Sequence, residues 1–176
     1  LSFADNLYLN GELISDVVIP DGVTTIPDSA FNGTSLTSIV IPDSVTSIGG
    51  NAFRNCDNLT SIVIPDSVTS IGYGAFYDCD SLTSVTMGEG ITTIGDYAFG
   101  YCENLESVYI SNLAAWCNID FTSYNSNPMY YAEKLYVNNE LISDFVIPDG
   151  VTRISYSAIR NCKNIVTLTI PDSVTS

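Results

Sequence analysis

Apolar residues recur along the chain at intervals of 22 or 23 residues, much longer than the period of one helix or one strand. Each unit contains the pattern Leu-x-x-Ile-x-Ile, followed in most units by Pro-Asp. The alternation predicts a short strand that buries one face, and the proline ends its pairing. The apolar triplets are Leu36, Ile39 and Ile41; Leu59, Ile62 and Ile64; Leu82, Val85 and Met87; Leu105, Val108 and Ile110; and Ile165, Leu168 and Ile170.

The remainder of each unit repeats as well. Val-Thr-x-Ile follows the Pro-Asp turn and predicts a second short strand on the opposite face of a coil. A small residue and a bulky apolar residue come next, and we expect them on a turn whose rings form an aromatic column in the interior. Ile159 would break this column. The pairs are Ala30–Phe31, Ala52–Phe53, Ala75–Phe76, Ala98–Phe99 and Ala158–Ile159, and the cysteines that follow most of them are Cys56, Cys79, Cys102 and Cys162.

A unit of this length is too short to bury its own apolar side chains, so neighbouring units must cover one another. Equivalent strands would then pair as a parallel sheet, and the apolar columns would join into one core. The predicted fold class is a repeat solenoid. We expect a right-handed stack of coils, made mainly of short parallel β-strands with turns and 3-10 segments.

A longer repeat overlies the short one. Residues 7–26 and 135–154 are identical at 16 of 20 positions, at an offset of 128. Between the two copies, residues 111–134 interrupt the regular spacing. Leu113 to Cys117 predicts one or two helical turns capped by Ser111 or Asn112, and a polar loop follows. Asn10-Gly11 and the matching Asn138-Asn139 predict hairpins.

These patterns predict one solenoid over residues 1–176. It consists of a hairpin and N-terminal coil (1–18), regular repeats (19–110), a helix-loop insertion (111–134), and a second hairpin with the next repeats (135–176). The chain begins without Met and stops at Ser176 inside a motif, so we expect it to be a piece of a longer protein.

The combination of Leu-x-x-Ile-x-Ile-Pro, Val-x-x-Ile-Gly and Ala-Phe-x-x-Cys resembles the BspA-like (Treponema pallidum-type) leucine-rich repeat family. The likeness covers about three quarters of the chain and recurs five or six times. It implies a secreted or cell-surface bacterial protein, because members of this family are associated with adhesion to host proteins or other cells. The sequence departs from the pattern at Met87-Gly88-Glu89-Gly90, at the missing cysteine near Asn32-Gly33, and at the insertion.

Charge and composition exclude several functions. The formal net charge is −15, from 20 acidic and 5 basic residues, which disfavours nucleic acid and anionic membranes as partners. No apolar run approaches the ~18 residues of a membrane span. The chain has no histidine, and its Ser, Thr and Asp residues belong to repeated columns. We therefore expect no catalytic residues, no enzyme activity and no cofactor.

Two columns of polar or reactive residues have simple structural interpretations. We expect the cysteines to be buried free thiols, because side chains in register point the same way and do not face one another. We interpret the acidic column as turn caps and not as a calcium ladder, since one carboxylate per coil cannot surround a cation. We therefore expect no metal site. The column comprises Asp21, Asp43, Asp66, Glu89, Asp149 and Asp172.

Outward positions of the longer strands are the candidate partner-binding residues, with Tyr109 as the largest anchor. Two tyrosine-rich groups compete with them, namely Tyr73, Tyr77, Tyr97 and Tyr101, and the inserted Trp116, Phe121, Tyr124, Tyr130 and Tyr131. The leading hypothesis is adhesion to a protein or glycan ligand. A structural spacer and self-association through uncapped ends are the alternatives. The candidate residues are Ser38, Val40, Ser61, Val63, Ser84, Thr86, Ser107 and Tyr109.

Overall fold

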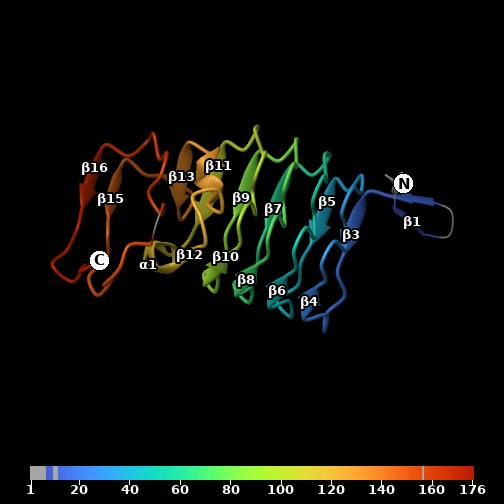
Figure 1. The fold of residues 1–176 in the computed structure, drawn as a ribbon, viewed down its shortest axis with the longest axis horizontal. Helices are drawn as coiled ribbons and strands as arrows, with labels where there is room; N and C mark the ends of the chain where they lie inside the picture. The colour runs from blue at the N-terminus through green and yellow to red at the C-terminus, as the bar shows by residue number, and fades with distance from the viewer. Residues whose placement is uncertain (1–6, 10–11, 156) are drawn as a thin grey trace.

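The computed structural model describes residues 7–9, 12–155 and 157–176, and it shows stacked coils whose strands form two faces (Figure 1). No helix in these ranges has the length and apolar character needed to cross a bilayer. The predicted repeat solenoid is confirmed. Because the regular coils have nearly the same sequence, they fold in the same way and lie on one another.

The longer strands form the first face of the stack, and we call its outer side the long face. Equivalent strands pair in parallel with the register that the repeat predicts, so that Ser61, Ser84, Ser107 and Lys134 lie opposite one another. The strands of this face up to the insertion's end are β3 (Asp16–Val18), β5 (Ser38–Val40), β7 (Ser61–Val63), β9 (Ser84–Thr86), β11 (Ser107–Ile110) and β13 (Lys134–Val137).

Two-residue strands form the second face. Each places its second residue inward, an isoleucine in all but β12, and pairs in parallel with its neighbour, as in Ile48 with Ile71 and Ile71 with Ile94. The second strand predicted for the coil at 151–154 is not formed. There, backbone bonds from Ile154 to Ser176 and from Thr175 to Thr152 join the coils. The strands are β4 (Thr25–Ile26), β6 (Ser47–Ile48), β8 (Ser70–Ile71), β10 (Thr93–Ile94) and β12 (Asp120–Phe121).

The predicted aromatic column fills the interior. The ring centroids of Phe31, Phe53, Phe76 and Phe99 lie 5.2, 5.1 and 5.2 Å apart, and successive rings are nearly parallel. This spacing is close to the ~4.8 Å between neighbouring strands, as expected when each coil contributes one ring. The backbone supports the same alignment, because each of the first three phenylalanines donates its N–H to the following coil's alanine carbonyl at 2.7 Å.

The cysteines are free, and Cys56, Cys79, Cys102 and Cys117 are buried as predicted. The thiols of Cys79 and Cys102 donate to the phenylalanine carbonyls of the preceding coil, Phe53 and Phe76, at 3.0 Å. Burial raises the pKa of Cys117 to about 11. Cys162 is only half-buried, although burial still raises its pKa to about 12.

The insertion forms a wider coil of its own. Helix α1 (Leu113–Asn118) lies where the sequence predicts it, and the Asn112 side chain caps it by accepting the Ala115 N–H at 3.0 Å. The sequence did not predict strand β12, which extends the second face beyond β10 because Phe121 is buried and anchors it. A 3-10 turn, η1 (Pro128–Tyr130), then leads back to the long face.

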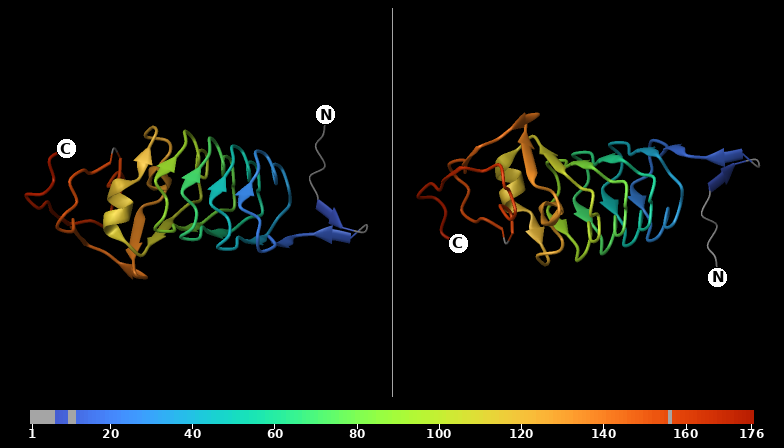
Figure 2. Two further views of the ribbon diagram at one scale, coloured as in Figure 1. Left: turned by 90° about the horizontal axis from the view of Figure 1, so that it is seen from below. Right: turned by 90° about the horizontal axis from the view of Figure 1, so that it is seen from above.

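Both predicted hairpins are present in the described residues. Strand β1 (Leu7–Leu9) pairs antiparallel with β2 (Glu12–Ile14) and projects beyond the coils (Figure 2), while Asn10-Gly11 lies outside the described residues. Strand β13 pairs with β14 (Glu140–Leu141) through Asn138 and Asn139, whose φ angles are +52° and +65°. Positive φ at both turn residues is typical of a type I′ hairpin.

The long face is not one continuous sheet, contrary to the prediction from the repeat. Strands β3 and β5 form one pair. Strands β7, β9, β11, β13 and β14 form a five-stranded sheet, and β15 (Asp144–Val146) and β16 (Thr167–Thr169) form another pair. The second interruption has a clear cause. Strand β14 folds back antiparallel onto the outer edge of β13, so β15 cannot pair there.

Candidate binding surfaces

The predicted contact residues lie on the long face in two rows. Ser61, Ser84 and Ser107 form one row by strand register, and Val63, Thr86 and Tyr109 form the other, with Ser38 and Val40 on the neighbouring pair β3–β5. Val40 and Val63 are 57% and 61% exposed, so they are accessible to a partner. Ser107 is buried, however, because its small side chain lies on a strand flanked by β9 and β13.

Tyr109 has an aromatic partner that the sequence pattern did not reveal. Its ring stacks on that of Tyr136 with 4.6 Å between the centroids and 16° between the planes. The two residues are direct register neighbours on β11 and β13, and both are half-buried. The insertion hides this relation in the sequence. Aligning Val108-Tyr109-Ile110 with Leu135-Tyr136-Val137 would have found it.

A hollow of about 430 Å³ lies beside this tyrosine pair. Val63, Thr86 and Tyr109 of the predicted surface contribute to its lining, together with Asn138 and Asn139 of the hairpin. The turn carboxylates Asp43 and Asp66 also line it, and no basic residue does. The hollow therefore combines exposed apolar side chains, an aromatic edge and negative charge.

The turn carboxylates connect one coil to the next. Asp66 accepts the Glu89 backbone N–H at 2.9 Å, and the Glu89 carboxylate accepts the Ser111 hydroxyl at 2.6 Å and the Asn112 amide at 3.2 Å. These bonds run to the neighbouring coil and not to the residue's own turn, so they differ from the turn caps that the sequence suggested. Within the described ranges, no three His, Cys, Asp or Glu side chains gather where they could hold a metal ion.

Asp16 makes comparable contacts at the start of the long face. The hydroxyls of Ser38 and Thr37 donate to its carboxylate, and these bonds lower the pKa of Asp16 below the ordinary value of 3.8. Ser38, a predicted contact residue, is therefore already engaged within the protein.

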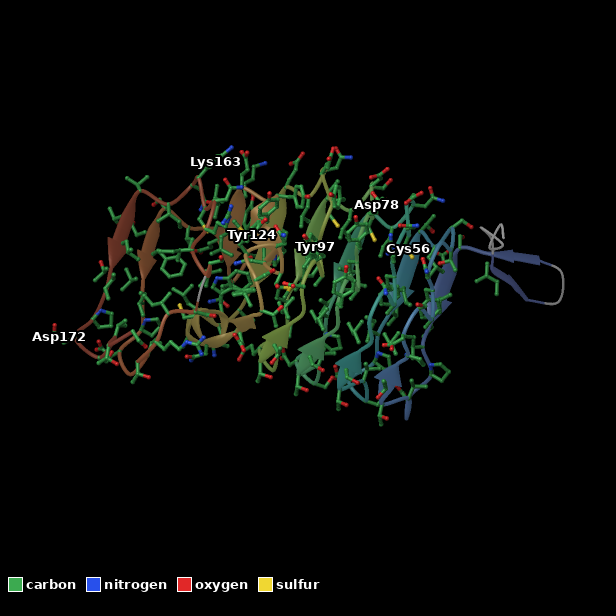
Figure 3. All side chains as sticks on the ribbon, in the orientation of Figure 1. Cys56, Asp78, Tyr97, Tyr124, Lys163 and Asp172 are labelled. Atoms are coloured by element: carbon green, nitrogen blue, oxygen red, sulfur yellow. The ribbon has the colours of Figure 1, made fainter. Side chains whose placement is uncertain are left out.

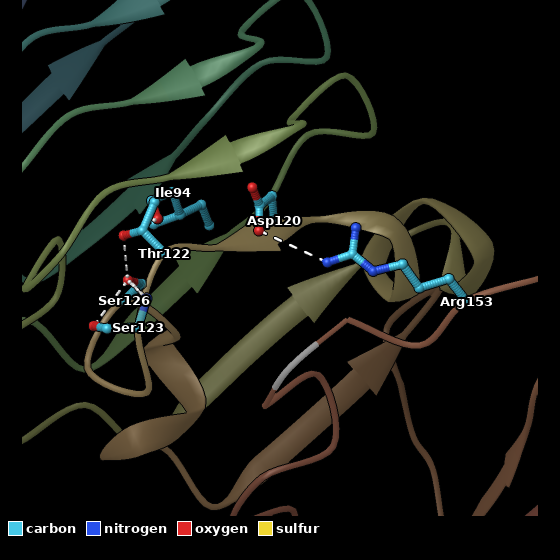
Figure 4. A network of polar contacts seen from close by, with 6 residues as sticks. All are labelled: Ile94, Asp120, Thr122, Ser123, Ser126 and Arg153. Atoms are coloured by element: carbon cyan, nitrogen blue, oxygen red, sulfur yellow. Dashed lines mark hydrogen bonds and ion pairs between the residues drawn. The ribbon is translucent and has the colours of Figure 1, made fainter. Parts of the chain in front are cut away.

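The insertion connects the regular coils to the coil that follows it (Figure 4). On one side, the Thr122 hydroxyl donates to the Ile94 carbonyl at 3.2 Å and lies 3.1 Å from the Ser126 hydroxyl. On the other side, Asp120 and Arg153 form an ion pair at 3.8 Å. Residues 111–134 thus bond to the coils on both sides.

Trp116 is the centre of this junction and not a contact residue. Its side chain is 1% exposed, and its indole N–H donates to the Ala158 carbonyl at 2.7 Å. Phe121 packs edge-on against it at 5.4 Å and is 3% exposed. The suggestion that these two rings form a partner patch is therefore wrong, because the following coil covers them.

The tyrosines of the insertion lie beside those of the repeats. Tyr97 and Tyr101 from one coil and Tyr124, Tyr130 and Tyr131 from the insertion line a common hollow of about 250 Å³. Figure 3 shows the labelled Tyr97 and Tyr124 on the same part of the surface. The sequence analysis treated these tyrosines as two separate groups. In the structure, members of both groups line the same hollow.

The fold and these surfaces define a class of protein. A stack of β-coils with repeated turns presents extended surfaces, and solenoids of this class are typically non-catalytic modules for binding or for structural support. The family model described as the BspA-type leucine-rich repeat region (six copies) matches residues 2–127 and 115–176. The chain therefore belongs to the BspA-type leucine-rich repeat family.

Solved structures with similar folds include three bacterial repeat proteins. A leucine-rich repeat protein of T. pallidum is 23% identical with a TM-score of 0.49, over 90% of this chain and 71% of that one. A leucine-rich repeat protein of Bacteroides ovatus is 21% identical with a TM-score of 0.49, over 89% of this chain and 54% of that one. A leucine-rich cell surface protein of Faecalibacterium prausnitzii is 21% identical with a TM-score of 0.43, over 89% of this chain and 59% of that one.

The chain thus spans little more than half the length of two of these three proteins. A comparison with curated protein sequences gave no match.

Proposed function

We propose that the chain is a non-catalytic protein-binding module of a secreted or cell-surface bacterial protein, and that it adheres to host or neighbouring-cell proteins through the long face. The observation that supports this most strongly is the hollow lined by Tyr109 and by the carboxylates of Asp43 and Asp66, with the Tyr109 ring supported by its stacking on Tyr136. Aromatic anchors in a concave surface are common centres of protein interfaces.

The outer side of the strands supplies an apolar contact area around this centre. Val18, Val40, Val63 and Val146 occupy equivalent outward positions and are 70%, 57%, 61% and 53% exposed. Burying such side chains against a partner is favourable by roughly 25 cal/mol per Å² of apolar surface removed from water. Rigid strands present these residues without a large loss of conformational entropy.

The negative net charge of the chain favours a partner with positive charge on its surface. With a net charge of −15 and two turn carboxylates in the hollow, the surface attracts proteins with a basic patch. Such complementarity raises the association rate at low salt more than it raises affinity. We therefore expect binding whose association rate falls as the ionic strength increases.

Binding to immobilised extracellular-matrix proteins and mucins tests the proposal. We expect saturable binding to at least one of them, and a loss of affinity of about tenfold or more in Tyr109→Ala and in Tyr136→Ala. The matched control is Tyr73→Ala, because Tyr73 is an exposed tyrosine (54%) that does not line the hollow. Binding that is unchanged in both long-face variants would contradict the proposed surface.

The alternative function is that of a spacer within a large surface protein. Small side chains in the outward serine row and the 128-residue repeat favour it, because a regular stack suits a stalk. A spacer would bind none of the tested proteins. Self-association is a third candidate, favoured by the exposed apolar residues Val166, Leu168 and Ile170 around β16. Light scattering at increasing concentration would detect it.

A further inference from the structure

A second recessed surface of different chemistry lies on the turns that lead from the second face back to the long face. We call it the tyrosine hollow, and it is lined by Tyr97, Gly100, Tyr101, Tyr124, Asn125, Tyr130 and Tyr131. It shares no lining residue with the hollow beside Tyr109. The two lie on opposite turns of the coils, since one follows the Pro-Asp segments and the other follows the two-residue strands.

The rings of the tyrosine hollow are held in place by contacts with the backbone and with one another. The Tyr131 hydroxyl accepts the Tyr101 backbone N–H at 3.0 Å, which joins the insertion to the repeat. Tyr130 packs edge-on against Tyr131 at 4.8 Å and lies 5.8 Å from Tyr124. The arrangement is therefore formed before any ligand arrives, which reduces the entropy lost on binding.

Gly100 allows the rings to lie this close. A Cβ atom at this position would lie 3.1 Å from Tyr77 Cδ2 and 3.2 Å from two side-chain atoms of Tyr97. These distances are tighter than ordinary van der Waals contacts, so any larger residue would push the rings apart. A larger residue at position 100 would thus displace Tyr97, one of the rings that line the hollow.

The lining carries no charged side chain, although the chain contains 20 acidic residues. A neighbouring hollow shows the contrast, because Glu103, Glu106 and Glu133 line it. Tyrosine rings offer apolar faces edged by hydroxyls, and the Asn125 amide adds a donor and an acceptor. This is the composition of sites for small neutral ligands, which combine apolar walls with a few polar groups.

Cationic ligands fit less well, since a cation already occupies the best position for one. The Arg160 guanidinium lies 5.2 Å from the Tyr124 ring centroid and 5.1 Å from that of Tyr130. This cation–π contact covers one face of each ring and places a positive charge beside the hollow, which repels a second cation. The guanidinium N–H groups also provide donors at the rim, which suit hydroxyl oxygens on a ligand.

We propose that the tyrosine hollow binds a neutral carbohydrate. A sugar ring has an apolar C–H face that can lie on a tyrosine ring, and hydroxyls around its edge that can bond to tyrosine hydroxyls, Asn125 and Arg160. The exposed ring of Tyr101 (48%) provides one contact face, and the face of Tyr124 (44%) opposite Arg160 provides the other. The site does not depend on the proposed protein-binding surface, since it lies on another part of the coil.

Titration of the full chain with defined probes tests this. The probes are three neutral trisaccharides (N-acetylglucosamine trimer, cellotriose and mannotriose), the cationic glucosamine trimer, anionic sialyllactose and a hexaproline peptide. Saturation-transfer NMR detects binding, and titration gives Kd. At least one neutral trisaccharide is expected to bind, with affinity reduced about tenfold or more in Tyr101→Ala and Tyr124→Ala.

Two further variants separate ring contact from loss of fold. Tyr124→Phe keeps the ring and removes one hydroxyl, so its affinity is expected to stay within about threefold of the wild type. Tyr109→Ala removes a tyrosine on the long face, outside this hollow, and is expected to change nothing. Circular dichroism of each variant confirms that the fold is retained.

Three results would overturn the proposal: no neutral trisaccharide binds, only the charged sugars or the hexaproline peptide bind, or Tyr101→Ala and Tyr124→Ala bind as tightly as the wild type. The two proposed sites are tested separately. Tyr109→Ala should leave sugar binding intact, and Tyr124→Ala should leave binding to a matrix protein intact.

Discussion

The regular repeats and the junction at the insertion are stabilised in different ways. In residues 19–110, each coil contacts the next through the same backbone bonds and the same small set of apolar side chains. At the junction, individual side chains make the contacts, among them Trp116 with Ala158 and Asn127 with Ser157. In the regular repeats, backbone hydrogen bonds therefore connect neighbouring coils. Where the insertion interrupts the repeat, the coils are connected by hydrogen bonds of individual side chains that occur once.

The charged residues reflect the same difference. The three ion pairs of the described residues are Lys134–Glu106, Arg153–Asp120 and Lys163–Glu133, and all three involve the insertion or its flanks. Four of the five basic residues lie at position 134 or later. Both candidate binding surfaces also lie where the two regions meet, because each combines tyrosines from a regular coil with tyrosines from the insertion or the strand after it.

The largest expected effect comes from the regular repeats. Phe76 is fully buried between Phe53 and Phe99, so Phe76→Ala leaves a cavity in the aromatic column. Chemical denaturation should show a loss of about 3–5 kcal/mol in the free energy of unfolding. A loss below about 1 kcal/mol would mean that the column does not carry the stability of the stack.

The junction should show a smaller and more local effect. Trp116→Phe keeps an aromatic ring but removes the indole donor of the buried Ala158 carbonyl. We expect a loss of about 1–3 kcal/mol, since a buried acceptor is left without its partner. Amide exchange should accelerate in residues 147–165 and stay slow in residues 59–99. Equal acceleration in both segments would show that the two regions do not differ in this way.

The surface ion pair at the junction should contribute least to stability. The side chains of Arg153 and Asp120 are 52% and 60% exposed, and solvent screens their attraction. Arg153→Ala should therefore change the free energy of unfolding by less than about 1 kcal/mol. Thermal denaturation at low and high salt measures this, and a large salt-dependent loss would assign the ion pair a structural role.

The smallest expected effect is the change in stability that results from protonation of Asp16 at low pH. Its pKa is lowered in the folded state by the hydroxyls of Ser38 and Thr37, so its contribution to stability is present above the ordinary value of 3.8 and is lost as the pH falls through the lower folded value. NMR titration should show the pKa of Asp16 rising toward 3.8 in Ser38→Ala. An unchanged titration would exclude these bonds as the cause.

The regular part of the fold could be predicted from the sequence because its signal is repeated. Most units independently indicated the strand at the Ile-x-Ile positions, the turn at Pro-Asp and the ring in the interior, and the stacked phenylalanines confirm the position of the ring. Local signals also sufficed at Asn112 and at Asn138-Asn139, where capping and hairpin formation depend on neighbouring residues.

The rest depends on contacts between distant segments that occur once. Nothing in the repeat shows that β14 blocks the edge of β13, that Trp116 is covered by the following coil, or that Phe121 anchors a strand. The sequence also placed Ser107 on an exposed surface, although that residue is buried on a strand flanked by β9 and β13. It missed Tyr136 because the insertion removes the regular spacing on which the assignment of outward positions relied.

The most direct test of the proposed function is an amide-exchange footprint of the chain bound to the matrix protein or mucin that it binds most tightly. Protection is expected in residues 61–66, 84–88, 107–110 and 134–139, the segments around Tyr109 and Tyr136. Protection confined to other parts of the chain, with these four segments exchanging as they do in the free protein, would contradict the account.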